Sequence, residues 1–157
     1  GIFAVQIAKI LGAEVTGVCS TKNVEFVKSL GADRVIDYTQ QDFTQETVQY
    51  DIIFDVVGKR SFSECKKVLK PSGIYVTTLP TPENILPGIV TTIIPGKKAK
   101  LVLASANARD LVYLKELIEA GKLRTVIDRT YSLQDLAAAH TYSESERAVG
   151  KIAIAVI

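Results

Sequence analysis

The sequence predicts a doubly wound α/β domain with a mostly parallel sheet, and three observations support this fold class. Short runs rich in β-branched residues alternate with helix-like segments along the whole chain, as in repeated strand–helix–strand units. The run 50–57 (YDIIFDVV) is almost continuously apolar, as expected for a strand covered on both faces of its sheet. Glycines follow several helix-like segments, where helices commonly end. Such strand–helix–strand connections are right-handed, which makes the expected sheet mostly parallel.

The first half of the chain divides clearly into elements. Gly12 and Gly31 mark the ends of two helices, and Thr21 or Asn23 can cap the second of them. The expected order is a helix over 2–10, strands over 14–19 and 34–38 separated by a helix from 21 or 23 to 30, a polar loop with at most a short helix over 39–49, and a strand over 50–57.

The second half is less regular, because prolines interrupt it at positions 80, 82, 87 and 95. We therefore expect an irregular excursion with at most short strands over 80–100. The other expected elements are a helix over 61–69, a turn at 71–73, strands over 74–79 and 100–104, a helix over 108–120, a turn and then a helix over 131–146, and a closing strand over 152–157.

Composition limits the functional classes. The 157 residues, of which 47% are hydrophobic, suit one globular domain, and a net charge of +2 argues against nucleic acid or an anionic membrane as the main partner. No run approaches a membrane span. The two cysteines form neither a metal-binding spacing nor a disulfide framework, so a cytoplasmic setting is expected. The chain starts at Gly1 and contains no methionine, which predicts a segment cut from a longer protein.

A ligand of this fold class lies beyond the carboxyl ends of the strands. A domain that binds NAD usually places a carboxylate after its second strand, for the ribose hydroxyls. Positions 18–24 contain no carboxylate and instead provide Ser20, Thr21, Lys22 and Asn23. Hydroxyl donors with a lysine suit the extra phosphate of NADP(H), which an acid would repel. The alternative is that Thr21 or Asn23 only caps a helix and Lys22 is only solvated.

Other strand ends provide further candidates, each with a plainer alternative. Tyr38 can lie over the adenine or donate to the same phosphate, and Gly58 allows close backbone approach or only completes a turn. Asp55 either receives hydrogen bonds from backbone or ribose, or lies at an exposed strand tip. Lys151 can meet the pyrophosphate or be solvated. No catalytic set and no metal-ligand cluster can be assembled, and His140 is expected to be an ordinary helix residue.

The chain resembles the medium-chain dehydrogenase/reductase superfamily, specifically its NADPH-dependent quinone oxidoreductase-like and zinc-binding-dehydrogenase-like members. The segments that carry the resemblance are 1–9 (GIFAVQIAK), 11–15 (LGAEV), 29–33 (SLGAD), 35–38 (VIDY), 50–58 (YDIIFDVVG), 69–73 (LKPSG) and 150–152 (GKI). The resemblance implies a Rossmann-type NADP(H)-binding domain over residues 1–157. It also implies that the first strand, most of the Gly-rich loop and a GroES-like catalytic domain lie upstream of Gly1, the last glycine of that loop.

The resemblance further implies roles for individual residues. Ser20 to Asn23 and Tyr38 match the 2′-phosphate and adenine region, and Lys151 matches a basic position near the pyrophosphate. The strand ends that face the nicotinamide match Val57, Gly58, Thr78 and Leu79. The implied reaction is hydride transfer from NADPH to a quinone, enone or other carbonyl compound, in a homodimer that pairs strands from residues 89–104.

Two alternatives to this function stay open. A methyltransferase shows a similar pattern at 50–57 and 69–76 but usually needs an acid after its second strand; a non-catalytic nucleotide-binding or scaffold domain would keep the fold alone. In the strand order 3-2-1-4-5-6 the missing strand is the central one. We therefore expect two half-sheets with unpaired edges, and a segment that does not fold stably by itself.

Overall fold

The computed structural model describes residues 1–156, apart from the side chain of Asn84. The chain divides into two compact units: Gly1–Val35 together with the segment from Ala108 onward, and Ile36–Asn107. Within the described residues the strands form three separate sheets, β1–β2, β3–β4–β5 and β6–β7. Two of these, β1–β2 and β3–β4–β5, correspond to the expected half-sheets, whereas the separate β6–β7 pair was not expected. The α/β class is confirmed.

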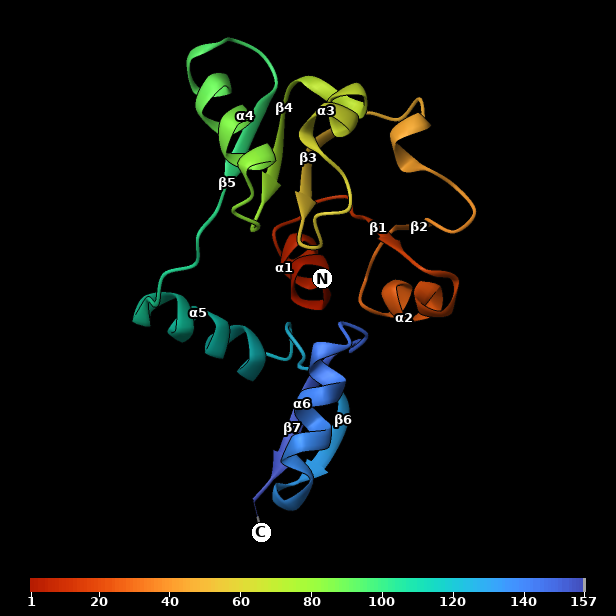
Figure 1. The fold of residues 1–157 in the computed structure, drawn as a ribbon, viewed down its shortest axis with the longest axis vertical. Helices are drawn as coiled ribbons and strands as arrows, with labels where there is room; N and C mark the ends of the chain where they lie inside the picture. Colours follow the sequence, from red (N-terminus) through yellow and green to blue (C-terminus); the bar gives the residue numbers. More distant parts are fainter. Residues whose placement is uncertain (157) are drawn as a thin grey trace. The chain divides into compact units, whose positions relative to one another are not determined.

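The first unit contains most of the helices. Helix α6 packs on the β6–β7 pair, whose strands are parallel (Figure 1). The elements of the first unit are α1 (Ile2–Ile10), β1 (Thr16–Cys19), a 3₁₀ helix (Thr21–Asn23), α2 (Val24–Ser29), α5 (Ala108–Glu119), β6 (Ile127–Ser132), a 3₁₀ helix (Leu133–Asp135), α6 (Leu136–Glu144) and β7 (Lys151–Ala155). Strand β2 (Arg34–Asp37) crosses the boundary between the two units.

The second unit is built on a three-stranded parallel sheet with helix α4 beside β5 (Figure 1). In its register Ile53 lies opposite Tyr75, and Asp55 lies opposite Thr77. The elements are a 3₁₀ helix (Phe43–Gln45), β3 (Tyr50–Asp55), α3 (Phe62–Cys65), a 3₁₀ helix (Lys66–Val68), β4 (Leu69–Thr77), α4 (Pro82–Ile93) and β5 (Lys98–Leu101).

The core of this second unit lies between β4 and α3. Phe62, Cys65, Leu69, Tyr75 and Ala99 are all buried and form one cluster. The rings of Phe62 and Tyr75 pack in a tilted arrangement with their centroids 6.0 Å apart. Aromatic pairs of this kind add to the stabilisation that burial of their apolar surface provides.

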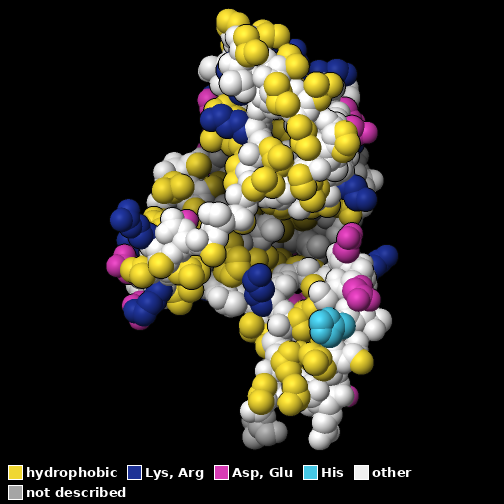
Figure 2. Space-filling view, turned by 60° about the vertical axis from the view of Figure 1, so that its left-hand side comes forward, with side chains coloured by type: hydrophobic (Ala, Val, Ile, Leu, Met, Phe, Trp, Pro, Cys, Tyr) yellow, Lys and Arg dark blue, Asp and Glu magenta, His cyan; other side chains and the backbone are white. Residues whose placement is uncertain are grey.

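Apolar side chains also remain at the surface. On β3, Ile52 is 62% exposed and Phe54 is 47% exposed. Figure 2 shows further apolar side chains over the upper part of the view, where α4 and β5 lie. Those on α4 and just after it are Ile85, Leu86, Ile89, Val90, Ile93 and Ile94.

Three sequence expectations were wrong. Residues 82–93 form helix α4 and not an irregular excursion, because Pro82 occupies the first turn, where no helical N–H partner is needed, and Pro87 is tolerated inside the helix. The turn at 71–73 lies inside β4 as a bulge, since the register jumps from Leu69 to Ile74 opposite Tyr50 and Ile52. The sequence also missed β6, whose polar residues resemble a turn.

Gly150 is required by close packing in the β6–β7 pair. A Cβ atom at this position would lie 2.6 Å from the carbonyl oxygen of Val126 and 3.1 Å from the backbone nitrogen of Asp128. The neighbouring Lys151 N–H donates to the same Val126 oxygen at 2.8 Å. A side chain at 150 would therefore push the two strands apart.

We expect Gly150→Ala to lower the free energy of unfolding by about 1–3 kcal/mol, the usual cost of overpacking. Urea unfolding of the complete protein measures this effect. The matched control is Gly88→Ala in α4, where the added Cβ meets only the Ala99 oxygen at 3.9 Å. Alanine in a helix should leave stability unchanged or raise it by about 0.5–1 kcal/mol. Equal stability of the Gly150→Ala variant and the wild type would contradict the described β6–β7 packing.

Candidate functional site

The carboxyl end of β3 forms a tight turn around the side chain of Asp55. Its Oδ1 atom accepts hydrogen bonds from the backbone N–H groups of Val57 at 2.9 Å and Gly58 at 2.7 Å. Gly58 has φ +74°, and a Cβ atom there would collide with Cδ1 of Leu79. The structure therefore brings together Val57, Gly58 and Leu79, three residues that the sequence assigned to the nicotinamide side.

Tyr75 supports this turn from the neighbouring strand. Its side chain is 1% exposed, and its hydroxyl lies 2.9 Å from Asp55 Oδ2 and 2.9 Å from the carbonyl oxygen of Arg60. Burial raises the pKa of the Tyr75 phenol far above its usual value, and the hydrogen bond to Asp55 adds to this shift. Asp55 is thus a half-buried carboxylate with backbone and tyrosine partners, and the reading of an exposed strand tip was wrong.

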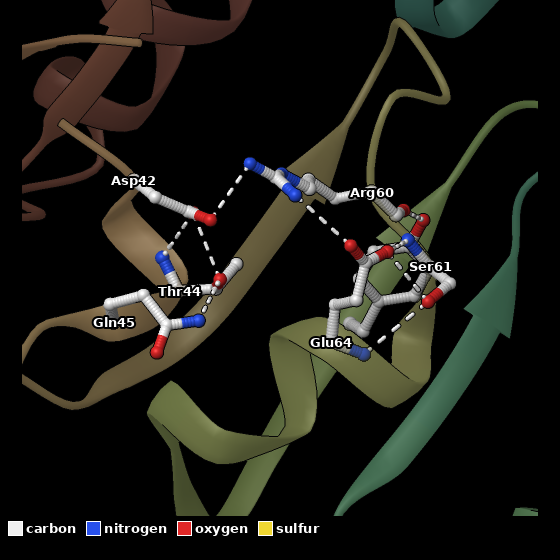
Figure 3. A network of polar contacts seen from close by, with 7 residues as sticks. Asp42, Thr44, Gln45, Arg60, Ser61 and Glu64 are labelled. Atoms are coloured by element: carbon white, nitrogen blue, oxygen red, sulfur yellow. Dashed lines mark hydrogen bonds and ion pairs between the residues drawn. The ribbon is translucent and has the colours of Figure 1, made fainter. Parts of the chain in front are cut away.

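A network of ion pairs and hydrogen bonds holds the end of the same loop (Figure 3). Arg60 lies between two carboxylates, with Nη2 2.9 Å from Asp42 Oδ2 and Nη1 3.0 Å from Glu64 Oε1. Glu64 Oε2 accepts from the backbone N–H and the hydroxyl of Ser61, each at 2.8 Å. With the Glu64 N–H donating to Ser61 Oγ at 3.3 Å, this is a capping box that begins α3.

The network changes the acidity of its members. The backbone N–H and hydroxyl of Ser61, followed by Arg60, lower the pKa of Glu64 from 4.5 to about 2. The backbone N–H of Thr44 is the main cause that lowers the pKa of Asp42, and Arg60 adds to it. Burial raises the pKa of the Cys65 thiol to about 12, so this cysteine is neutral and suits the core, not nucleophilic chemistry.

The turn after β1 contains the residues predicted to bind a phosphate. Ser20 is extended, and the 3₁₀ helix Thr21–Asn23 follows it. Asn23 occupies the N-cap position of α2, but its side chain makes no capping hydrogen bond and contacts Ser20 Oγ at 3.4 Å. Thr21 and Lys22 are exposed. The structure therefore gives no support to a capping role for the Asn23 side chain, and it places a lysine and two hydroxyls on one short turn.

Lys22 also lies near a carboxylate of the same unit. The pKa of Asp128 is lowered mainly by the hydrogen bond from Tyr142, and the charge of Lys22 contributes a smaller part. The Tyr142 hydroxyl donates to Asp128 Oδ2 at 2.7 Å. The Val149 N–H donates to the same oxygen at 3.1 Å, and Lys22 itself is exposed.

Tyr38 follows β2 in a turn that Asp37 organises. Asp37 Oδ1 accepts from the Thr39 backbone N–H at 2.9 Å and from its hydroxyl at 2.7 Å. Tyr38 is 61% exposed. Tyr38 belongs to the second unit, whereas Ser20 to Asn23 belong to the first.

Gly1 and Lys151 lie together at the start of α1. Gly1 is the N-cap residue of that helix, and its carbonyl accepts from the Val5 N–H at 3.2 Å. The Lys151 ammonium lies 5.5 Å from the centroid of the Phe3 ring in the first turn of this helix. A lysine thus lies near the positive end of the helix dipole.

The other predicted residues and the rest of the described surface were compared with these turns. Thr78 is exposed, and His140 is exposed on α6. Among residues 1–156 no group of histidine, cysteine and acidic side chains could hold a metal ion, and no helix there is long and apolar enough to cross a membrane. A depression of about 500 Å³ contains Lys9 and Arg124, but Lys9 pairs with Asp33, and Arg124 donates to the Ser29 carbonyl.

Comparison with known proteins decides the family. The family model described as zinc-binding dehydrogenase matches residues 30–154. The chain belongs to this family. It is the cofactor-binding domain of a member of the medium-chain dehydrogenase/reductase superfamily, whose members are nicotinamide-dependent oxidoreductases. The resemblance inferred from the sequence is confirmed, and the methyltransferase alternative is removed.

Three similar proteins illustrate the match. Quinone-oxidoreductase QR1 of Triphysaria versicolor is 34% identical over 98% of this chain and 48% of its own length. NADPH-dependent alkenal/one oxidoreductase of Arabidopsis thaliana is 33% identical over 98% of this chain and 37% of its own. The quinone oxidoreductase structure from Coxiella burnetii has a TM-score of 0.80 and 29% identity, covering 99% of this chain and 49% of that one. The chain therefore spans about half the length of its relatives or less.

Sequence reasoning missed the side chains that hold the loop after β3. Tyr75, Arg60 and Asp42 come from three different segments, and no motif joins them. The one available signal was the carboxylate of Asp55 in an apolar run, which had to find a partner.

The lowered pKa of Glu64 predicts a pH-dependent contribution to stability. The folded pKa is below the unfolded value, so Glu64 stabilises the fold above pH 4.5, and this stabilisation is lost as the pH falls toward about 2. Glu64→Gln should lower stability at neutral pH and flatten its decline in acid. Urea unfolding of the complete protein from neutral pH to about pH 3 measures both effects. Glu119→Gln, which breaks an exposed ion pair with Lys115, is the control. A decline as steep in Glu64→Gln as in the wild type would contradict the described network.

Proposed function

We propose that residues 1–157 are the NADP(H)-binding domain of an enzyme that transfers hydride to a quinone, an enone or another carbonyl compound. The turn after β1, which offers hydroxyls and a lysine where an NAD-binding domain has a carboxylate, carries the coenzyme part of this proposal. The names of the quinone and alkenal/one oxidoreductases described above support the choice of substrate.

The residues present fit the 2′-phosphate of NADP(H). Lys22 is exposed and would pair with the phosphate, while Ser20 and Thr21 would donate hydrogen bonds to its oxygens. No acidic residue lies between positions 18 and 24 to repel the phosphate. Tyr38 would cover the adenine or donate to the same phosphate.

The other parts of the coenzyme have candidate partners as well. The N-terminus of α1 at Gly1, together with Lys151, would bind the pyrophosphate. Val57, Gly58, Thr78 and Leu79 would line the nicotinamide end, where Val57 is 64% exposed and the packed Gly58 and Leu79 would exclude water. When bound, NADPH supplies the hydride; the chain's own residues bind and orient it.

The rest of the enzyme is also a proposal. A central strand, the remaining Gly-rich loop and a GroES-like domain would complete the protein, and the GroES-like domain would provide most substrate contacts and the catalytic groups. Two copies would pair through residues 89–104, where β5 and the exposed Val102 and Leu103 lie. Cys19 and Cys65 form no disulfide with each other, which suits a reducing, cytoplasmic setting.

Lys22→Glu tests the choice of coenzyme. In the complete protein it should weaken NADPH binding by about tenfold or more, because a charge-assisted hydrogen bond is replaced by repulsion. NADH binding should change little or improve. Lys115→Glu on α5 is the control, since this lysine lies in an exposed ion pair with Glu119. Fluorescence titration measures both affinities. Tighter binding of NADH than NADPH by the wild type would overturn the NADP(H) assignment.

Turnover separates the enzyme from a scaffold domain. The complete protein should oxidise NADPH in the presence of a quinone or an enone, with the loss of absorbance at 340 nm as the measurement. A protein that binds NADPH and oxidises it with no member of a quinone and enone panel would favour the non-catalytic alternative.

A further inference from the structure

Two buried hydroxyl side chains of β4 contact the loops that end β4 and β3. The Leu79 N–H donates to Thr77 Oγ1 at 3.2 Å. The Tyr75 hydroxyl donates to Asp55 Oδ2 at 2.9 Å. The other oxygen of Asp55 accepts from Val57 and Gly58.

The Thr77 hydroxyl accepts a hydrogen bond from the Leu79 N–H, the Tyr75 hydroxyl donates one to Asp55, and the Asp55 carboxylate only accepts. Thr77 and Tyr75 are each 1% exposed, so neither hydroxyl can exchange its partner for bulk water. A buried polar group that loses its partner is costly, which makes the arrangement specific.

The register of the sheet explains why these side chains meet. Asp55 lies opposite Thr77, and Ile53 lies opposite Tyr75, so Asp55, Thr77 and Tyr75 point to the same face. The phenol reaches past one residue to the end of β3. There its hydroxyl also lies 2.9 Å from the carbonyl oxygen of Arg60, at the far end of the loop after β3.

We propose that Tyr75 and Thr77 are positioning residues for the coenzyme: Tyr75, through Asp55, holds the Val57–Gly58 backbone, and Thr77 holds the backbone of Leu79, at the nicotinamide end. This inference rests on the proposed function. Neither hydroxyl needs to touch the coenzyme, because each is buried behind the loops that would.

The experiment uses Tyr75→Phe and Thr77→Val in the complete protein. Both variants remove one hydroxyl, so the loops should become more mobile and NADPH binding should weaken by about fivefold, the effect of one lost hydrogen bond. Thr77→Ser keeps the hydroxyl and should bind NADPH within about twofold of the wild type. Tyr50→Phe is the matched control, since its hydroxyl bonds to Glu46 away from these loops at 3.0 Å.

Two measurements distinguish positioning from a general loss of stability. Amide hydrogen exchange without coenzyme should accelerate at 56–60 in Tyr75→Phe and at 78–79 in Thr77→Val, and in neither segment in Tyr50→Phe. Steady-state kinetics should show a raised KM for NADPH with a smaller change in kcat. If Tyr75→Phe does not fold, the Thr77→Val and Thr77→Ser pair carries the test.

The outcomes are separable. Unchanged NADPH affinity and unchanged exchange in Thr77→Val would overturn the inference while leaving the proposed function intact. A loss of unfolding free energy without any effect on NADPH binding would also overturn it. Failure of the wild type to bind NADPH would overturn the proposed function, and the inference with it.

Discussion

The requirement that a carboxylate in a half-buried strand must be fully hydrogen-bonded organises the second unit. Asp55 ends β3 and receives two backbone N–H groups and one phenol. Those bonds decide the path of the loop, the left-handed conformation of Gly58 and its contact with Leu79. They also explain why Tyr75 lies in the core next to Phe62: its ring packs against the Phe62 ring, while its hydroxyl donates to Asp55 at the end of β3.

The two units carry different kinds of surface. In the first unit, the turn after β1 contains Lys22 and two hydroxyls, and Lys151 lies near the start of α1. In the second unit, the loops after β3 and β4 carry apolar side chains on a backbone that Asp55 and Thr77 hydrogen-bond. The proposed coenzyme combines both chemistries, since it contains charged phosphates and a flat nicotinamide ring.

Local signals in the sequence predicted most helices and strands correctly. They failed where contacts between distant segments determine the secondary structure. Helix 2–10 and strand 50–57 were predicted from period and composition, and both formed close to the expected bounds. The prolines at 82 and 87 were misleading, because a breaker at a helix start costs nothing and α4 gains contacts with β5. Strand β6 was missed since its polar residues are paired by distant partners such as Tyr142. The same reason hid Tyr75, whose role needs the register of two strands.

The contact between Gly58 and Leu79 has an evolutionary consequence. The space that a side chain at 58 would need is filled by Leu79, and the left-handed backbone already disfavours most residues there. The end of the Leu79 side chain can turn aside, whereas the left-handed backbone at 58 persists whatever residue stands at 79. Descendants of this gene should therefore vary position 79 more readily than position 58.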